Sequence, residues 1–169
     1  MDTSFLPLVE ETMRQFPSGV FLTTGKQANP MTIGWGAIGI QWGRPVMTVM
    51  VRRSRFSHGL IESGDFTVSV PAPGTMKDEL AFCGSKSGRD VDKVKELGLD
   101  LLEPKAGTVK AVGGCSIVFE CRKLYTLPCP GNELMLDKDI LNRFYNGVTD
   151  EGGNLHDFYF GEIVAAYRE

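Results

Sequence analysis

Residues 34–39, GWGAIG, carry the spacing G-x-G-x-x-G that marks the first loop of dinucleotide-binding α/β folds. In those folds a helix begins at the glycines, and an acidic residue about 20 positions later binds the ribose. Here Gly43 and Pro45 would break such a helix, and residues 46–51, VMTVMV, favour a strand. Residues 12–61 contain no Asp or Glu. The stretch is therefore predicted to be glycine-rich strand, whose glycines permit curvature or the close approach of a flat ligand.

The composition is that of an ordinary globular protein. At 169 residues, 42% of them hydrophobic, the chain is predicted to form one domain over residues 1–169. A net charge of −3 gives no general attraction to nucleic acid or membrane, and no apolar run is long enough to span a bilayer. The N-terminal residues lack the pattern of a signal peptide, so we expect a cytoplasmic protein.

The four cysteines form no C-x-x-C pair, and with only two histidines they argue against a zinc or other metal site. Reduced, mostly buried thiols are expected instead. Cys129 lies in the turn PCPG and is the one cysteine expected to be exposed.

Short apolar runs recur along the chain with small helical stretches between them. Because they do not follow a regular β-α-β order, we predict a mainly β fold, an antiparallel barrel with short peripheral helices. Residues 136–147 are ambiguous between helix and loop. The predicted helices are 4–16, 57–64, 74–84 and 90–98, and the predicted strands are 20–26, 31–42, 46–51, 65–71, 108–112, 115–127 and 156–169.

Two loops have the composition of phosphate-binding sites. Residues 51–57, VRRSRFS, place arginines and hydroxyls between an apolar strand and a helix, where backbone N–H groups are available. A serine that caps the helix beside solvated arginines explains this run equally well. Residues 83–93, CGSKSGRDVDK, form a second such loop, for which a solvated turn is the simpler interpretation when it is taken alone.

Trp35 adds an aromatic side chain to this set. A lone tryptophan in a strand is usually part of the core. Between two glycines, and after the polar residues Asn29 and Thr32, it could instead form the wall of a slot for a planar ring. A ring slot together with two anion-binding loops fits a ligand with the shape of flavin mononucleotide (FMN).

The combination of these segments resembles the flavin reductase-like, FMN-binding split-barrel family, which includes the flavoredoxins. The resemblance extends from about residue 16 to the end and is carried by residues 29–36, 52–71, 83–93 and 161–167. It implies a six-stranded antiparallel split barrel and a homodimer that holds FMN near its interface. By this resemblance, the segment along the flavin ring comprises Asn29, Met31, Thr32 and Trp35, the phosphate end comprises Arg53, Ser54 and Ser57, and the second loop comprises Ser87, Gly88 and Lys93.

The resemblance implies an FMN-dependent oxidoreductase of the flavin reductase or flavoredoxin type. Electrons would come from NADH or NADPH, or from a ferredoxin-like redox partner. An FMN-binding electron carrier that does not itself use a nicotinamide is the alternative, and a barrel that has lost flavin is a third possibility. No catalytic acid or base is assigned, and His156 and the pair Tyr159 and Phe160 are left open between flavin contact and strand packing.

Overall fold

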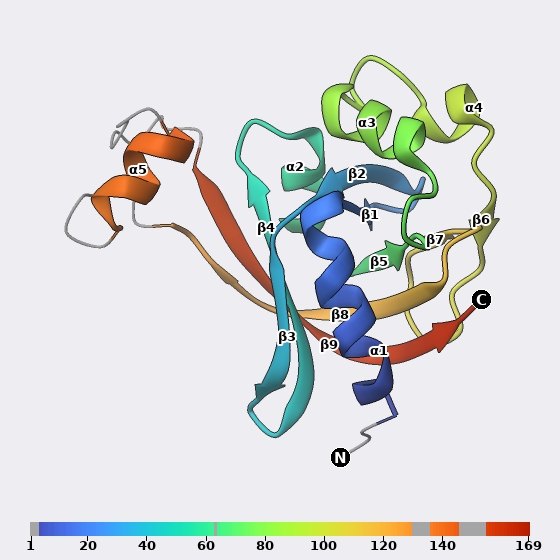
Figure 1. Cartoon of the computed structure of the whole chain (residues 1–169), viewed down its shortest axis with the longest axis horizontal. Helices are drawn as coiled ribbons and strands as arrows, with labels where there is room; N and C mark the ends of the chain where they lie inside the picture. The colour runs from blue at the N-terminus through green and yellow to red at the C-terminus, as the bar shows by residue number, and fades with distance from the viewer. Residues whose placement is uncertain (1–3, 63, 130–135, 146–154) are drawn as a thin grey trace.

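The computed structural model describes residues 4–62, 64–129, 136–145 and 155–169 (Figure 1). The chain begins with helix α1, Leu6–Gln15, and a turn of 3-10 helix, η1, Phe16–Ser18. The buried side of α1 includes Leu8 and Thr12, and the Thr12 hydroxyl donates to the Leu8 carbonyl at 2.8 Å. Gly19, with φ of 104°, then turns the chain into the first strand. The predicted N-terminal helix is confirmed.

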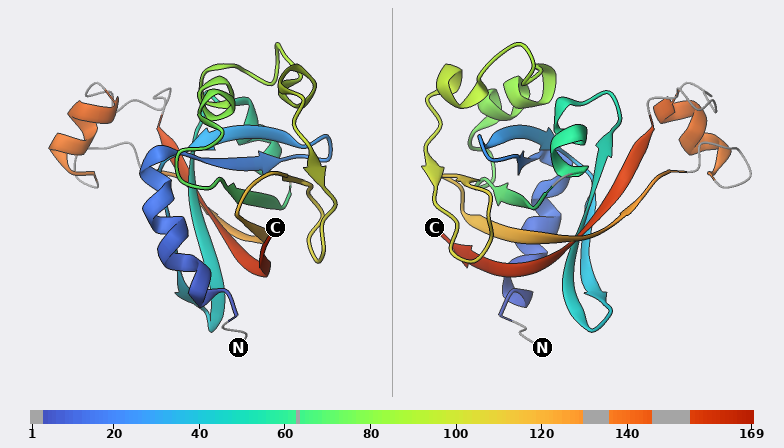
Figure 2. Two further views of the ribbon diagram at one scale, coloured as in Figure 1. Left: turned by 45° about the vertical axis from the view of Figure 1, so that its right-hand side comes forward. Right: turned by 180° about the vertical axis from the view of Figure 1, so that it is seen from behind.

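Seven antiparallel strands form one sheet in the order β2-β1-β5-β8-β9-β4-β3, which confirms the mainly β, antiparallel prediction. Strongly curved long strands wrap the sheet around its core (Figure 2). The strands are β1 Val20–Thr24, β2 Asn29–Ile33, β3 Gly36–Gln41, β4 Arg44–Arg52, β5 Phe66–Val70, β8 Ile117–Leu127 and β9 His156–Arg168. A separate pair is formed by β6, Leu101–Leu102, and β7, Ala111–Val112.

The main sheet has seven strands instead of the six implied by the family resemblance, because residues 31–42 are not one strand. The chain bends at Gly34 and Trp35, so that β2 pairs with β1 and β3 pairs with β4. Gly36 begins β3 against the Phe16 ring, where a Cβ would lie 2.7 Å from Phe16 Cζ. A strand, and not a helix, follows the glycines, so the rejection of the dinucleotide motif is confirmed.

Four short helices lie outside the sheet. They are α2 Phe56–Glu62, α3 Lys77–Ser85, α4 Lys93–Leu97 and α5 Lys138–Tyr145. Helices α2, α3 and α4 gather over the end of the barrel formed by β1 and β2, and α5 lies beyond the far ends of β8 and β9 (Figure 1). The ambiguous segment therefore contains a helix. No helix of the described residues is long and apolar enough to cross a membrane.

The core lies between the faces of the curved sheet and under α1. Strands β1 and β5 are buried along their whole length. A second cluster packs Phe21 of β1 against Leu80 and Cys83 of α3. All four cysteines are free and buried. The expected exposure of Cys129 is therefore wrong: its N–H donates to Asp157 Oδ1 at 3.0 Å, which holds it against the third cluster beside α5.

Candidate functional site

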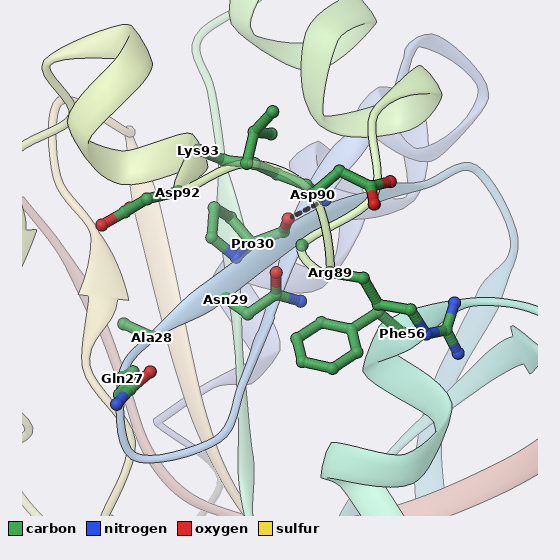
Figure 3. A pocket seen from close by; sticks show the side chains of 11 residues that line it. Gln27, Ala28, Asn29, Pro30, Phe56, Arg89, Asp90, Asp92 and Lys93 are labelled. Atoms are coloured by element: carbon green, nitrogen blue, oxygen red, sulfur yellow. Dashed lines mark hydrogen bonds between the residues drawn. The ribbon is translucent and has the colours of Figure 1, made fainter.

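Three cavities adjoin one another where β2, α2 and the loop between α3 and α4 meet. We call them the tryptophan, serine and asparagine cavities, with volumes of about 240, 90 and 240 Å³. The tryptophan cavity is lined by Met31, Thr32, Ile33, Gly34, Trp35, Met50, Arg52, Arg55 and His156. The serine cavity is lined by Ser54, Arg55, Phe56, Ser57, Lys86, Ser87, Gly88, Arg89 and Lys93. The asparagine cavity is lined by Gln27, Ala28, Asn29, Pro30, Phe56, Gly88, Arg89, Asp90, Val91, Asp92 and Lys93 (Figure 3).

Trp35 is part of a cavity wall and not of the core. It lies at the bend between β2 and β3 and is 40% exposed. Its ring centroid is 4.9 Å from that of Phe144 on α5 and 5.1 Å from that of His156 at the start of β9. These neighbours hold the indole at one side of the tryptophan cavity, where a flat ligand could lie beside it.

His156 presents a neutral imidazole to the same cavity. Its Nδ1 is 2.8 Å from the Tyr145 hydroxyl. Burial, and then the nearby Arg52 guanidinium, lower the pKa of His156 to about 4, so the ring is uncharged near pH 7. Arg52 also lies 5.3 Å from the centre of the Tyr145 ring and donates to the Phe144 carbonyl at 3.0 Å. Through these contacts with Phe144 and Tyr145, Arg52 and His156 hold α5 beside the tryptophan cavity.

Arg55 lines both the tryptophan and the serine cavity. Its guanidinium donates to the carbonyls of Gly84, at 2.6 Å, and Cys83, at 3.0 Å. Burial lowers the pKa of Arg55, but an arginine stays charged in proteins. These two bonds fix a positive charge between the cavities.

The serine cavity is rich in donors and positive charge. The nearly buried Ser57 hydroxyl accepts a hydrogen bond from Asn29 Nδ2 at 2.8 Å. Lys93 is only 3% exposed, and its Nζ donates to the Pro30 carbonyl at 2.8 Å. Burial lowers the pKa of Lys93, while its bonds to carbonyl oxygens suit the ammonium form. Four cationic side chains line this cavity: Arg55, Lys86, Arg89 and Lys93. Among the described residues that line it there is no carboxylate.

A model of the flavin reductase-like domain matches residues 13–169. The chain belongs to the flavin reductase-like family. The resemblance read from the sequence is thereby confirmed. A comparison with curated proteins gave no match.

Solved structures with similar folds include other flavin proteins. Flavoredoxin from Methanosarcina acetivorans is 27% identical, with a TM-score of 0.67 over 89% of this chain and 68% of that one. An FMN-binding protein from Thermus thermophilus is 22% identical, with a TM-score of 0.65 over 88% and 68%. The NADH:FAD oxidoreductase of Streptomyces globisporus C-1027 is 19% identical, with a TM-score of 0.63 over 100% and 86%. The fold of this flavin reductase-like chain is thus the split barrel of the family.

The structure brings nine of the ten site residues inferred from the sequence to the three cavities. Met31, Thr32 and Trp35 line the tryptophan cavity, and Ser54, Ser57 and Ser87 line the serine cavity. Asn29 lines the asparagine cavity, and Gly88 and Lys93 line both the asparagine and the serine cavity.

Arg53 lies elsewhere and lines none of the three cavities. Its backbone N–H donates to the Leu155 carbonyl, which directs the side chain toward β9. There Nη2 donates to Asp157 Oδ1 at 2.9 Å and to the Cys129 carbonyl at 3.1 Å. Asp157 raises the pKa of Arg53, and this ion pair gives the guanidinium a structural role.

Seven lining residues with charged or aromatic side chains, His156 apart, were not selected from the sequence: Arg52, Arg55, Phe56, Lys86, Arg89, Asp90 and Asp92. All of them lie within the two loops predicted to bind phosphate, so the residues chosen from these loops were only part of the cavity lining. Helices and strands repeat their side-chain directions with a fixed period, but a tight turn does not. The sequence therefore does not predict which side chains of such a turn face a cavity. His156, which was left open, lies in the tryptophan cavity.

Proposed function

We propose that the protein is an FMN-dependent oxidoreductase of the flavin reductase or flavoredoxin type. It would take reducing equivalents from NADH or NADPH, or from a redox partner, and pass them on through FMN. The observation that carries this proposal is the adjacency of the tryptophan and serine cavities, which share Arg55. One suits a flat ring and the other suits the phosphate attached to it.

The serine cavity has the chemistry that a phosphate requires. Ser54, Ser57 and Ser87 bring hydroxyls to it, and four cationic side chains surround them. Hydrogen bonds from charged donors to phosphate oxygens are among the strongest in proteins. The loop backbone can also come close, because Gly88 has no Cβ. The residues present therefore fit the phosphate end of FMN.

The tryptophan cavity has the chemistry that a flavin ring requires. Trp35, Met31 and Met50 supply apolar surface, while Arg52 and the neutral His156 supply polar groups at its edge. Bound FMN would supply hydride and electron transfer at its ring. The side chains of the protein would hold the ring in place, contact its polar edge and limit the access of water. No residue is proposed as a general acid or base.

The use of a nicotinamide is supported by the fold shared with an NADH:FAD oxidoreductase. An FMN-binding carrier that receives electrons from a protein is the second candidate. The similarity to flavoredoxin and the 40% exposure of Trp35, which opens the ring cavity to a partner, favour it.

Anaerobic rapid mixing separates these two functions. The purified protein should bind FMN and turn yellow, and NADH or NADPH should bleach the bound flavin. Bleaching by a reduced ferredoxin-like protein, but by neither nicotinamide, would instead establish the carrier. A colourless protein that takes up no added FMN would contradict both.

We also propose the homodimer that the resemblance implies. An aromatic cluster at the turn between β3 and β4 and on β8 and β9 supports it: Trp42 is 66% and Tyr125 49% exposed, and the Trp42 ring lies 6.4 Å from those of Tyr125 and Phe160. Exposed apolar clusters of this kind often mark interfaces. Sedimentation should show a dimer at micromolar concentration and weaker association for Trp42→Ser. A monomeric native protein would contradict this proposal.

A further inference from the structure

Tyr145 and His156 are bonded to each other beside the tryptophan cavity. Tyr145 is the last residue of α5 and His156 is the first of β9, and the Tyr145 hydroxyl lies 2.8 Å from His156 Nδ1. Both side chains are buried. His156 lines the cavity and Tyr145 does not. Tyr145 can therefore act on a ligand in the cavity through the imidazole to which it is bonded.

The direction of this hydrogen bond decides which nitrogen of His156 carries the proton. A neutral imidazole has one N–H donor and one bare nitrogen that accepts. Burial raises the pKa of Tyr145, so its hydroxyl keeps its proton and can donate it. Burial lowers the pKa of His156 to about 4, so near pH 7 the ring has a bare nitrogen. A phenol is the better donor of the two groups, which favours donation from Tyr145 to Nδ1 and a proton on Nε2.

Nε2 of His156 is left for a ligand. It lies on the side of the ring away from Nδ1 and therefore away from Tyr145. Within the described part of the chain Nε2 has no hydrogen-bond partner, and the fully buried side-chain atoms without one are the hydroxyls of Thr23 and Thr24. Nε2 is thus accessible from the cavity that His156 lines.

The position of the His156 ring is fixed from two directions. Its centroid lies 5.1 Å from that of Trp35 and 5.7 Å from that of Tyr145. The backbone beside it is held as well, because the next residue, Asp157, forms an ion pair with Arg53. The imidazole therefore has a defined orientation, and its hydrogen bond to Tyr145 decides what it offers to a ligand.

The tryptophan cavity favours an electron-rich ligand. Arg52 and Arg55 line it, and none of its described lining residues is a carboxylate. An N–H donor on His156 would add to these two positive charges. Hydrogen bonds from the protein to a flavin ring tune its electronic properties, and a fixed donor stabilises the electron-rich reduced ring more than the oxidised ring.

We propose that Tyr145 is a positioning residue that holds His156 as the Nε2–H tautomer, so that His156 donates a hydrogen bond to the flavin ring and favours its reduced state. Tyr145 itself does not contact the ring. This inference rests on the proposed flavin site and gives that site a means of tuning how easily the flavin is reduced.

Nitrogen-15 NMR of the histidine rings tests the tautomer in protein without flavin. The chain has two histidines, so the signals that His156→Gln removes are those of His156. Near pH 7 the native protein should carry the proton on Nε2, and Tyr145→Phe, which cannot donate, should show both tautomers. A native proton on Nδ1, an imidazolium, or an identical tautomer in Tyr145→Phe would overturn the proposal. The native spectrum alone decides the tautomer if the variant does not fold, as judged by circular dichroism.

Reductive titration of the FMN-loaded protein tests the effect on the flavin. Tyr145→Phe should weaken the binding of reduced FMN relative to oxidised FMN by about three- to tenfold, as expected for one hydrogen bond. A tenfold change in this ratio corresponds to about 30 mV in the potential of a two-electron couple. Tyr167→Phe is the matched control: its hydroxyl donates to Glu120 at 3.0 Å and lines none of the three cavities, so the ratio should not change.

His156→Gln separates positioning from packing. Its amide NH₂ is a neutral donor that does not depend on a tautomer. When Tyr145→Phe is added to His156→Gln, the ratio of the two affinities should therefore change by less than about twofold. An equal effect of Tyr145→Phe in both backgrounds would show that Tyr145 acts through packing and would overturn the proposal.

An unchanged ratio in folded Tyr145→Phe would also overturn it. Native protein that binds no flavin would instead refute the proposed function, while the tautomer measured without flavin would still decide the arrangement of Tyr145 and His156.

Discussion

Gly88 and Asn29 are packed so closely that a Cβ on Gly88 would lie 2.0 Å from the Asn29 Oδ1 atom. Asn29 Nδ2 in turn donates to the buried Ser57 hydroxyl at 2.8 Å. The loop before α4, the start of β2 and the start of α2 are therefore held together by one short chain of contacts. The spacing of the serine and asparagine cavities depends on this arrangement.

Gly88→Ala should disrupt that spacing. The added methyl group must displace Asn29 or the loop, at a cost of about 1–3 kcal/mol in the free energy of unfolding. FMN affinity should fall as well, because the serine cavity changes shape. Urea unfolding and FMN titration measure the two effects. Gly59→Ala is the matched control: a Cβ at Gly59, inside α2, meets nothing within 4 Å, so it should stabilise the protein by about 0.5–1 kcal/mol.

Arg55→Ala should weaken FMN binding through the loss of the charge between the ring and phosphate cavities. A hydrogen bond to a charged group contributes about 1.5–3 kcal/mol, which corresponds to a loss of roughly tenfold to a hundredfold in affinity. Riboflavin, which has no phosphate, should lose much less affinity than FMN. An equal loss for both ligands would show that Arg55 does not act on the phosphate.

Arg53→Ala should lower the stability of the protein and leave its FMN affinity unchanged. Removing this side chain leaves Asp157, which is 5% exposed, without its guanidinium partner. Arg53 is 30% exposed and Asp157 keeps the Cys129 N–H and His58 as partners, so the loss should cost about 1–3 kcal/mol, which urea unfolding can measure. FMN affinity of the folded variant should stay within about twofold of the native value. A selective loss of FMN affinity without loss of stability would return Arg53 to the phosphate site.

Trp35→Ala should reduce the affinity for the flavin ring. Aromatic contacts contribute about 0.5–1.5 kcal/mol beyond the area they bury, so FMN and riboflavin should weaken by similar factors. Stability should change little, because the side chain is 40% exposed. Leu6→Ala is the control, since Leu6 is 54% exposed and lines none of the three cavities. If both variants bind flavin like the native protein, the ring does not lie beside Trp35.

Glu120 makes stability depend on pH. This buried carboxylate accepts the N–H groups of Lys105, Ala106 and Gly107 at 2.7–2.8 Å, and the Tyr167 hydroxyl at 3.0 Å. Burial acts to raise the pKa of Glu120, but these four hydrogen bonds outweigh it, and the pKa is lowered. The carboxylate therefore stabilises the fold above the unfolded pKa of about 4.3, and this contribution is lost as the pH falls through the folded pKa.

Glu120→Gln tests that dependence. Its amide NH₂ cannot accept from the loop N–H groups, so the variant should lose about 1–3 kcal/mol at pH 7. The difference from the native protein should shrink as the pH approaches 3. Urea unfolding at several pH values gives this comparison, and a difference that stays constant with pH would contradict the role of the ionised carboxylate.

The local elements could be predicted because each has a short-range signal. The alternating pattern in residues 65–71 and the apolar spacing in residues 4–16 correspond to β5 and α1. The division between β2 and β3 could not be predicted, because the same glycine-rich pattern continues through the bend at Gly34. β2 pairs with β1 and β3 pairs with β4. The residues of β2 and β3 do not by themselves predict these partners.

The site residues show the same limit. The loops were identifiable from their arginines, serines and glycines, but the roles of Arg53 and Arg55 depend on how the turn after β4 is oriented. That orientation follows from the bond between the Arg53 N–H and the Leu155 carbonyl, about a hundred residues away in sequence. The burial of Cys129 likewise results from Asp157, a contact that no local pattern reveals.

Strands β2 and β3 are consecutive in the chain, yet they form the two outermost edges of the seven-stranded sheet. Only Gly34 and Trp35 connect them, and the tryptophan cavity is lined both by β2 and by β4, the neighbour of β3. A flavin ring bound there would contact both β2 and β4 and so connect the two edges of the sheet. When flavin binds, amide hydrogen exchange should then slow in both edge strands, β2 and β3, at the same time. Binding at one site would thus stabilise both edges of the sheet.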